Sequence, residues 1–382
     1  MLEMLETMEL EQETVFCSQC GITFEQEELT EFDGESLCVE CLDNHTFLCD
    51  CCHERFWNDD QSGDYDTPLC EGCYDSYYTR CEQCHCVISR DYANYEAGDE
   101  DGDYPYCDSC FDSNGDGRYL HDYSYKPLPI FYGEGNRYFG VELEIDNGGK
   151  ENENAETITR LANISDDNIY IKTDGSLDDG LEIVTHPMTL AYHMSNMPWS
   201  DILDKSLELG YQSHKTSTCG LHIHINRDSF GANPKEQDES IGRILFMVER
   251  FWSELLRFSR RTERQIQQWA NRYGYKDNPS QILDHAKQGG RGRYAAVNIT
   301  NWNTIEFRLF RGTLKYNTLI ATLQLVNEIC DVAFFMSDEE VGMVSWCDFV
   351  ARFDAEKCPE LITYLKERRL YINDAIESEE DE

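Results

Sequence analysis

Short segments in which apolar residues alternate with charged or imidazole side chains recur through the second two-thirds of the chain. A period of two is typical of a β-strand that buries one face and leaves the other free for polar groups. The alternation therefore predicts a set of strands that share one core. The predicted strands are 139–146, 168–173, 181–185, 220–226, 293–299 and 304–310.

Longer segments with apolar residues three and four positions apart separate these strands, and this spacing predicts helices. The clearest extend from about 236 to 270 and from about 316 to 336. Strands interleaved with such helices predict an α+β domain in which helices cover a sheet. The apolar face of the first helical segment comprises Ile241, Ile244, Leu245, Val248, Phe251, Trp252, Leu255 and Leu256.

The first third of the chain has a different pattern, which its cysteines set. The chain has 18 cysteines, and twelve of them form six Cys-x-x-Cys pairs. The interval from Cys17 to Cys49 is 32 positions, and the same interval leads on to Cys81. A fixed interval predicts repeated units, and four thiolates per unit suit the tetrahedral coordination of structural zinc. The paired cysteines are Cys17, Cys20, Cys38, Cys41, Cys49, Cys52, Cys70, Cys73, Cys81, Cys84, Cys107 and Cys110.

Units of this size bury too little apolar surface to fold alone, so metal binding would supply folding free energy. Phe24, Phe32 and Phe56 are candidates for miniature cores. The layout resembles half-LIM or treble-clef zinc fingers in series and predicts about three zinc ions. The alternative is a redox dithiol module, which three matched units disfavour. The remaining donors, expected to be bystanders, are His45, Cys51, His53, His85 and Cys86.

Charge narrows the classes of partner. The chain has 74 acidic and 32 basic residues, a net charge of −42. Such a surface repels phosphate backbones and anionic lipids, so we expect no nucleic-acid and no membrane partner. It favours cationic partners, or it is simply a solvated surface that aids solubility. Glutamates near the N-terminus argue against a secretory signal, and no apolar run approaches the ~20 residues of a membrane helix. We therefore expect a cytoplasmic protein, in which reduced cysteines bind metal.

The composition changes along the chain and predicts its organisation. A linker rich in Asp, Gly, Tyr and Pro separates the cysteine repeats from the strand-rich part. The predicted parts are an acidic segment at 1–16, three zinc-binding units at 17–110, the linker at 111–136, a sheet domain at 137–335, a helical segment at 336–376 and an acidic tail at 377–382.

Three of the predicted strands carry two chemical groups each on one face. Residues two apart in a strand point the same way, so Glu142 faces with Glu144, His222 with His224, and Glu306 with Arg308. Alone, these pairs would be a solvated strand face, core histidines and a cross-strand ion pair. Together they predict a site on one sheet face. Further candidates nearby are Asp174 and Ser176 in a predicted turn and Glu182 on a short strand.

The types of residue indicate the chemistry. Carboxylate oxygens with one or two imidazoles suit magnesium or manganese better than zinc. Arg308 and Arg311 suit phosphate oxygens, because a guanidinium binds them through two donors. Metal, carboxylate and arginine together are typical of phosphoryl transfer. A second arginine cluster is expected to be a solvated face paired with acids, with a substrate-carboxylate site as the alternative. Its members are Arg257, Arg260, Arg261 and Arg264.

At these residues the chain resembles the amidoligase family, which is related to glutamine synthetase and glutamate–cysteine ligase. The resemblance covers about 137–335 and implies a curved antiparallel sheet with covering helices and ATP-dependent carboxylate–amine ligation. Relatives of glutamine synthetase often assemble, which leaves an oligomer open. The motifs that carry the resemblance are 140–144, 174–176, 182–185, 219–224 and 304–308, followed by Gly312 and Thr313.

The resemblance also implies roles for individual residues. Glu142 and Glu144 match the strand that holds magnesium, with Glu182 and Glu306 as further metal acids. His222 and His224 match a strand in which one histidine binds metal near the nucleotide. Arg308 matches the arginine that contacts the transferred phosphate. Arg311, Asp174 and Ser176 match less closely, and Arg293 and Asn298 are candidates to face the substrate.

The functional hypothesis is an ATP- and magnesium-dependent ligase that forms an amide or isopeptide bond through an acyl phosphate. Its substrate would be a peptide, protein or cell-wall component presented by the zinc units. One alternative is a non-enzymatic zinc-finger interaction protein with a degenerate ligase-like scaffold. Another is a small-molecule ligase, in which the zinc units have no obvious task. A degenerate site would be expected to have lost some of its main residues, so their joint presence favours an enzyme. These residues are Glu142, Glu144, Glu182, His222, Glu306 and Arg308.

Overall fold

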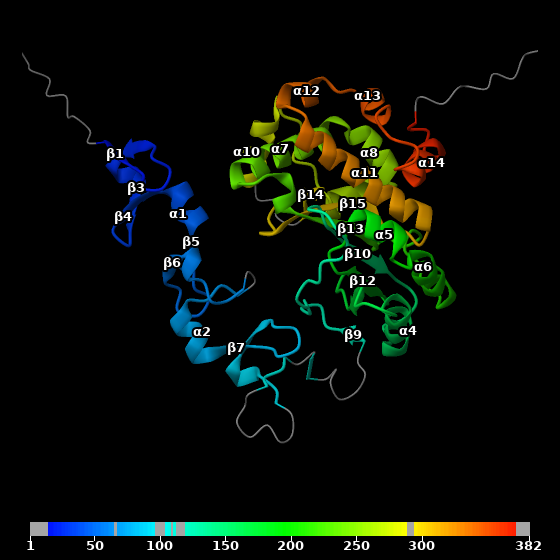
Figure 1. The fold of residues 1–382 in the computed structure, drawn as a ribbon, viewed down its shortest axis with the longest axis horizontal. Coiled ribbons are helices and arrows are strands. Elements are labelled where there is room, and N and C mark those ends of the chain that lie inside the picture. Colours follow the sequence, from blue (N-terminus) through cyan, green and yellow to red (C-terminus); the bar gives the residue numbers. More distant parts are fainter. Residues whose placement is uncertain are drawn as a thin grey trace, which may run out of the picture. The chain divides into compact units, whose positions relative to one another are not determined.

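The computed structural model describes residues 14–64, 67–95, 104–107, 110–111, 119–288 and 294–371. The acidic N-terminal segment up to residue 13, the tail at 377–382 and Arg293 lie outside the described residues. The chain separates into two compact units, Met1–Phe111 and Asp112–Glu382 (Figure 1). The finer domain boundaries stay predictions.

The first unit repeats a small pattern of hairpin and short helix. Cys38 and Cys70 are the N-cap residues of two such helices, so the second cysteine pair of these repeats spans a helix start. The elements are β1 (Thr14–Phe16), β2 (Thr23–Glu25), η1 (Gln26–Glu28), β3 (Leu29–Phe32), β4 (Glu35–Cys38), α1 (Val39–His45), β5 (Thr46–Leu48), β6 (Arg55–Trp57), η2 (Asn58–Asp60), α2 (Glu71–Tyr77), β7 (Tyr78–Arg80), β8 (Val87–Ser89) and η3 (Arg90–Tyr92).

Small apolar clusters support these repeats. Leu37 is buried against Phe24 and Phe32, and Leu69 is buried against Phe56. The predicted miniature cores are therefore present, although each consists of only a few side chains.

The second unit is built on a seven-stranded sheet in the order β14-β15-β13-β10-β12-β11-β9. The neighbouring pairs are antiparallel except β9 and β11, which are parallel. The sheet is thus mixed, and the predicted antiparallel sheet is wrong at this edge, where the short strand β9 runs in the same direction as β11. The strands are β9 (Leu120–His121), β10 (Phe139–Ile145), β11 (Ile169–Lys172), β12 (Leu181–Thr185), β13 (Gly220–Asn226), β14 (Val297–Asn298) and β15 (Thr304–Arg311).

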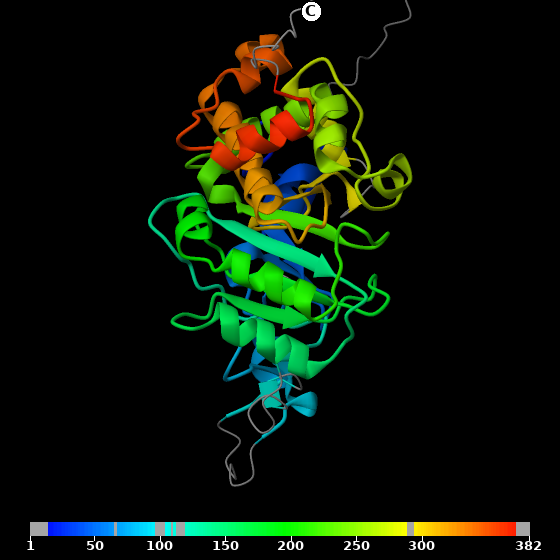
Figure 2. The same ribbon diagram turned by 90° about the vertical axis from the view of Figure 1, so that its right-hand side faces the viewer.

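Helices pack against one face of this sheet and share a single core with it (Figure 2). The apolar positions of the alternating strands, such as Val141, Ile223 and Phe307, are fully buried there. The α+β class is therefore confirmed. The helices are α4 (Asn152–Ala162), α5 (Leu190–Ser195), α6 (Trp199–Glu208), η4 (Arg227–Phe230), α7 (Pro234–Arg250), α8 (Trp252–Ser259), α9 (Glu263–Trp269), α10 (Pro279–Gln288), α11 (Tyr316–Phe335), α12 (Asp338–Met343), α13 (Trp346–Val350) and α14 (Pro359–Glu367).

One expectation about apolar runs needs correction. Helix α11 has 20 residues and a mean hydropathy of 1.4, which is long and apolar enough to span a membrane. However, 72% of its apolar window is buried inside the protein. It lies beside α7 and α14 and joins the main core, as the central helix of a globular unit does.

Candidate active site

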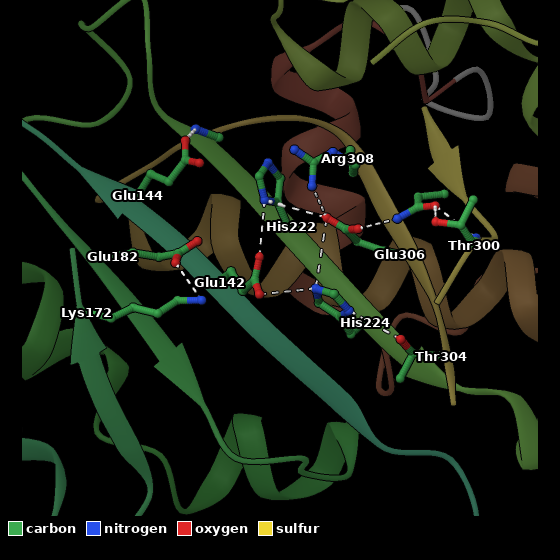
Figure 3. Close-up of polar contacts among 12 residues, drawn as sticks. Glu142, Glu144, Lys172, Glu182, His222, His224, Thr300, Thr304, Glu306 and Arg308 are labelled. Atoms are coloured by element: carbon green, nitrogen blue, oxygen red, sulfur yellow. Dashed lines mark hydrogen bonds and ion pairs between the residues drawn. The ribbon is translucent and has the colours of Figure 1, made fainter. Parts of the chain in front are cut away.

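Two rows of polar residues cross the middle of the sheet on the face away from the core. In one row Glu142 on β10 lies opposite His222 on β13. In the other, His224 on β13 lies opposite Glu306 on β15, which lies opposite Asn298 on β14. Directly opposed residues of antiparallel strands point to the same face. The register alone therefore gathers these side chains, and Figure 3 shows them converging.

Two carboxylates and two imidazoles form the centre of this group. Oε2 of Glu142 is 3.3 Å from Nδ1 of His222, and Oε1 of Glu142 is 3.4 Å from Nε2 of His224. Oε1 of Glu306 is 3.7 and 3.9 Å from the same two nitrogens. Arg308 donates from Nη1 to this Oε1 as well (Figure 3). Both histidines thus lie between the two acids.

Partners beyond the centre hold it in place. Asn298 donates from Nδ2 to Oε2 of Glu306 at 2.9 Å, and its own Oδ1 accepts from the hydroxyl of Thr300 at 2.7 Å. Nδ1 of His224 is 3.3 Å from Oγ1 of Thr304. Asn298 is 1% exposed. In this structure it therefore orients Glu306.

The charges of the centre are mutually supporting. Burial raises the pKa of Glu142, but His224 and His222 outweigh it and hold that pKa well below the usual range. Burial likewise opposes ionisation of Glu306, yet the two histidines and Arg308 lower its pKa. Burial lowers the pKa of His224, and the two glutamates reverse this and raise it. These surroundings favour the ionised form of both carboxylates.

A second carboxylate pair lies next to the centre. Glu182 on β12 is opposite both Lys172 and Glu144, and its Oε2 is 3.1 Å from Nζ of Lys172. Burial and the nearby Glu142 raise the pKa of Glu182 well above its usual range. Glu144 accepts a hydrogen bond from the backbone N–H of Gly220, and burial raises its pKa. A cation bound next to Glu182 and Glu144 would lower both pKa values and favour the ionised carboxylates.

A β-bulge explains where Arg311 lies. Leu221 pairs with Phe310 but Ile223 pairs with Phe307, so β15 has one extra residue between them. The extra residue reverses the side of every position that follows. Arg311 consequently lies opposite Gly220, on the same face as the histidines, although its odd number predicts the other face.

The part of the chain that forms this site is similar to a known protein family. Residues 136–330, which are 195 of the 382, match the family described as "Putative amidoligase enzyme". The chain belongs to the amidoligase family. The predicted resemblance is therefore confirmed, and all of the strands that form the candidate active site lie inside the matched region.

Other comparisons add little to this amidoligase assignment. A bifunctional glutathione synthetase from Pasteurella multocida is similar, with 14% identity and a TM-score of 0.31. The similarity covers 61% of this chain and 46% of that one, so the amidoligase chain spans less than half of that protein's length. No curated protein matches.

The donor set of this amidoligase fits a divalent cation. Two groups of possible ligand atoms are present, and within each group the atoms lie within 4.8 Å of one another. The first consists of Glu142, His224 and Glu306, and the second of Glu142, Glu182 and His222. Nε2 of His224 and Oε2 of Glu182 are buried, and the contacts described for them are ion pairs, with Glu142 and Glu306 for the histidine and with Lys172 for Glu182. Buried ligand atoms held only by such charge pairs can exchange a partner for a bound cation. The mainly carboxylate set suits magnesium or manganese.

The remaining predicted residues have other surroundings. Oδ1 of Asp174 accepts from the backbone N–H of Ser176 at 2.6 Å, which closes the predicted turn near Glu144. Arg311 binds backbone carbonyl groups at the end of β15, away from Glu306. Arg293 lies outside the described residues. Lys172 and Thr304 were not predicted as site residues. Their only signal is position, because Lys172 lies opposite Glu182 and Thr304 lies two residues before Glu306 on the same strand.

The four-cysteine clusters form as predicted in the first unit. In each set of four, the sulfur atoms lie within 4.8 Å of one another. The residue after each first Cys-x-x-Cys pair has a positive φ and closes a tight turn, which aims both sulfurs at one point. Cys86 is an extra thiol, with its sulfur 3.3 Å from that of Cys84. The turn residues are Gly21, His53 and His85.

Proposed function

We propose that this amidoligase is an ATP- and magnesium-dependent carboxylate–amine ligase that forms an amide or isopeptide bond through an acyl phosphate. We further propose that its sheet is a catalytic core of the glutamine synthetase type. The observation that supports this best is the register that brings Glu142, His222, His224, Glu306 and Arg308 to one face. These are the groups that phosphoryl transfer to a carboxylate requires.

The metal would bind to the two donor groups that share Glu142, and Mn²⁺ could replace Mg²⁺ there. Such a cation neutralises the charge of the phosphate oxygens when it is bound. Ionised Glu142 and Glu306 are suited to hold it. His224 and His222 each complete one of these two donor groups. On binding the metal, Glu182 would either give up its ion pair with Lys172 or contact the metal and Lys172 together.

Arg308 is proposed to stabilise the transferred phosphoryl group. Glu306 fixes one end of its guanidinium, and its Nε is buried without a hydrogen-bond partner among the described residues. The side chain of Arg308 is therefore held in one orientation while its Nε–H remains available to a ligand. A preorganised cation of this kind stabilises charge that develops in a transition state.

The reaction needs activation because a carboxylate is a poor acyl donor and an amine is protonated at neutral pH. An oxygen of the substrate carboxylate attacks the γ-phosphorus, and ADP leaves. The amine, after losing a proton, attacks the acyl carbon, and phosphate leaves with the carboxylate oxygen. The protein's part is to orient the two substrates and to balance charge on the phosphoryl group.

The three cysteine clusters are proposed to hold about three zinc ions as closed, structural sites. We propose that the unit they stabilise presents a peptide, protein or cell-wall substrate to the sheet. Its many acidic side chains would favour a substrate or partner with cationic groups.

The test is ATP-dependent formation of hydroxamate from pooled carboxylates and hydroxylamine, which traps an acyl phosphate. We expect Arg308→Ala to lower turnover by about 100-fold or more, because losing one positioned donor costs on the order of 3 kcal/mol. Arg160→Ala is the matched control, since Arg160 is exposed on α4, where it contacts Glu156 and the ring of Tyr119 and no residue of the candidate site among those described. Near-wild-type turnover in a folded Arg308→Ala protein would contradict the proposal. Absence of any turnover would favour the scaffold alternative.

A further inference from the structure

Arginines gather in one open cleft of this very acidic protein. The cleft has a volume of about 450 Å³ and is lined by residues of α8, the end of β15 and the end of α14; Figure 1 labels these elements. No aspartate or glutamate of the described residues lines it. Its lining residues are Arg257, Arg260, Arg261, Arg311, Arg368, His214, Ser253 and Leu256.

Three of the five arginines are held by backbone carbonyl groups. Nη2 of Arg311 donates to the carbonyl oxygen of Thr216 at 3.0 Å, and Nε of Arg261 donates to that of Phe310 at 3.1 Å. Nη2 of Arg368 donates to the carbonyl oxygen of Arg257 at 2.8 Å. Neutral acceptors fix the side chains and leave their charge in place.

Arginines elsewhere in the described residues fall into two groups. Six of them form ion pairs with carboxylates, and others, such as Arg80 and Arg250, bind carbonyl oxygens. None of the five in the cleft pairs with a carboxylate of the described part of the chain, so the expected pairing with acids is wrong for Arg257, Arg260 and Arg261. Arg257 is exposed, as a solvated face would be, whereas Arg261 is only 7% exposed. Five arginines gathered without a carboxylate pair concentrate positive charge that an anionic ligand can neutralise. The six paired arginines are Arg55, Arg137, Arg160, Arg243, Arg272 and Arg308.

The cleft adjoins the sheet face of the candidate active site. A Cβ atom on Gly220 would lie 2.5 Å from Nη2 of Arg261 and 2.7 Å from Nε2 of His222. One guanidinium of the cleft and one histidine of the site thus flank the same glycine. Arg311 is opposite Gly220 on the neighbouring strand. A ligand in the cleft would consequently end next to the site.

The positive field of the cleft also acts on its neighbours. Burial lowers the pKa of His214 to about 4, and Arg260, Arg311 and Arg368 contribute to that shift. Burial lowers the pKa of Arg261 to about 10; the nearby Glu144 opposes this shift, and Arg308 and Arg311 add to it. Nε of Arg311 is buried and has no hydrogen-bond partner in the described residues. The cleft therefore offers both charge and at least one unused donor.

We infer that this arginine cleft binds the anionic end of the substrate, a chain that carries two or more carboxylates such as an acidic peptide. A guanidinium binds a carboxylate through two parallel hydrogen bonds, and five of them line a space that can admit several carboxylates. A nucleoside triphosphate fits less well, because no acid among the described residues of the cleft could hold its metal ion. Leu256 is the one apolar side chain among the described lining residues that could contact a base. The link to acyl transfer rests on the proposed function, but the binding itself does not.

The test is calorimetric titration of the full chain with tetraglutamate, without ATP or Mg²⁺. Tetraglutamine and metal-free ATP are the comparison ligands. We expect tetraglutamate to bind, tetraglutamine not to bind, and added salt to weaken binding, because the recognition is by charge. The double variant Arg257→Gln/Arg368→Gln should bind tetraglutamate about 10-fold more weakly or worse. Arg264→Gln should bind as the wild type does, since Arg264 is exposed and outside the cleft.

Several outcomes would overturn the inference. They are equal binding of both peptides, no binding of tetraglutamate, or an unchanged affinity in the double variant. Binding of ATP alone, lost in the double variant, would assign the cleft to the nucleotide instead. Because nothing turns over in this experiment, its failure would leave the ligase proposal standing. A failed hydroxamate assay would likewise leave the peptide site standing.

Discussion

Two buried glutamates show how differently one residue type can be used. Glu249 is 5% exposed, and its oxygens accept from the backbone N–H groups of Tyr273 and Gly274 and from Arg272. It is a fully satisfied structural carboxylate. Glu306 is 3% exposed, yet its neighbours include two histidines that also face Glu142. Only at Glu306 can a bound cation take the place of one of the present neighbours of the carboxylate.

This contrast predicts the effect of neutralising each glutamate. Glu306→Gln should abolish Mn²⁺ binding at the sheet site, which electron paramagnetic resonance of the bound ion would measure. Glu249→Gln should keep Mn²⁺ binding but destabilise the fold by about 2 kcal/mol or more, because buried charged hydrogen bonds are lost. Retained Mn²⁺ affinity in Glu306→Gln would remove this residue from the metal site.

A buried histidine outside the site predicts how stability depends on pH. His193 on α5 is fully buried, accepts from Nε1 of Trp199 through Nδ1, and burial lowers its pKa to about 4. The unfolded chain takes up this proton near pH ~6.5, so stability falls as the pH drops from there toward about 4. The loss amounts to up to about 3 kcal/mol.

The measurement is urea unfolding of the wild type and of His193→Phe at about pH 7.5 and about pH 5. The variant should be less stable at the higher pH, because Trp199 loses its acceptor. The difference between the two proteins should shrink by about 2 kcal/mol at the lower pH, because only the wild type pays for a neutral histidine. A difference independent of pH would show that His193 does not titrate in this way.

At the residue scale, alternation was a good guide only where the strands are regular. The faces of Glu142, His222 and Glu306 follow from the period of two, since β10 and β13 pair without interruption. The face of Arg311 does not, because the bulge in β15 is set by its neighbour strand. The unpaired state of Arg261 could not be predicted either, since the sequence does not show which acids are out of its reach.

At the scale of elements, the helices show what periodicity misses. The expected segment from about 236 to 270 is three helices, interrupted at Phe251 and at Arg260, which has a φ of 59°. The second break has a local signal, because Thr262 and Gln265 form a capping box at the start of α9. The segment expected at about 316–336 matches α11 almost to the residue, because its apolar positions continue without a break.

The cysteine units allow a test of which thiols bind metal. Cys49 is fully buried in the second set of four, whereas Cys51 lies between the members of a pair and outside that set. Cys49→Ser should lower the zinc content from about three to about two per chain, and Cys51→Ser should leave it at about three. Mass spectrometry under non-denaturing conditions would count the ions. Equal loss in both variants would show that Cys51 is a ligand.

At the scale of the whole molecule, the chain has two kinds of candidate metal-donor group in separate units. The first unit offers three thiolate sets, and the second offers oxygen and imidazole donors on a sheet face. Composition predicted this division, because cysteine pairs end where the alternating strands begin. It could not predict the cleft, which is assembled from α8, β15 and α14, elements that are more than 100 residues apart at their extremes.

The central claim is that the sheet face activates a carboxylate by phosphorylating it. Transfer of oxygen-18 tests this most directly, with an acidic peptide labelled in its carboxylates, an amine, ATP and Mg²⁺. Our account predicts one labelled oxygen in each phosphate released, and loss of this transfer in Arg308→Ala. Amide formation with unlabelled phosphate, or phosphate release without any amide, would contradict it.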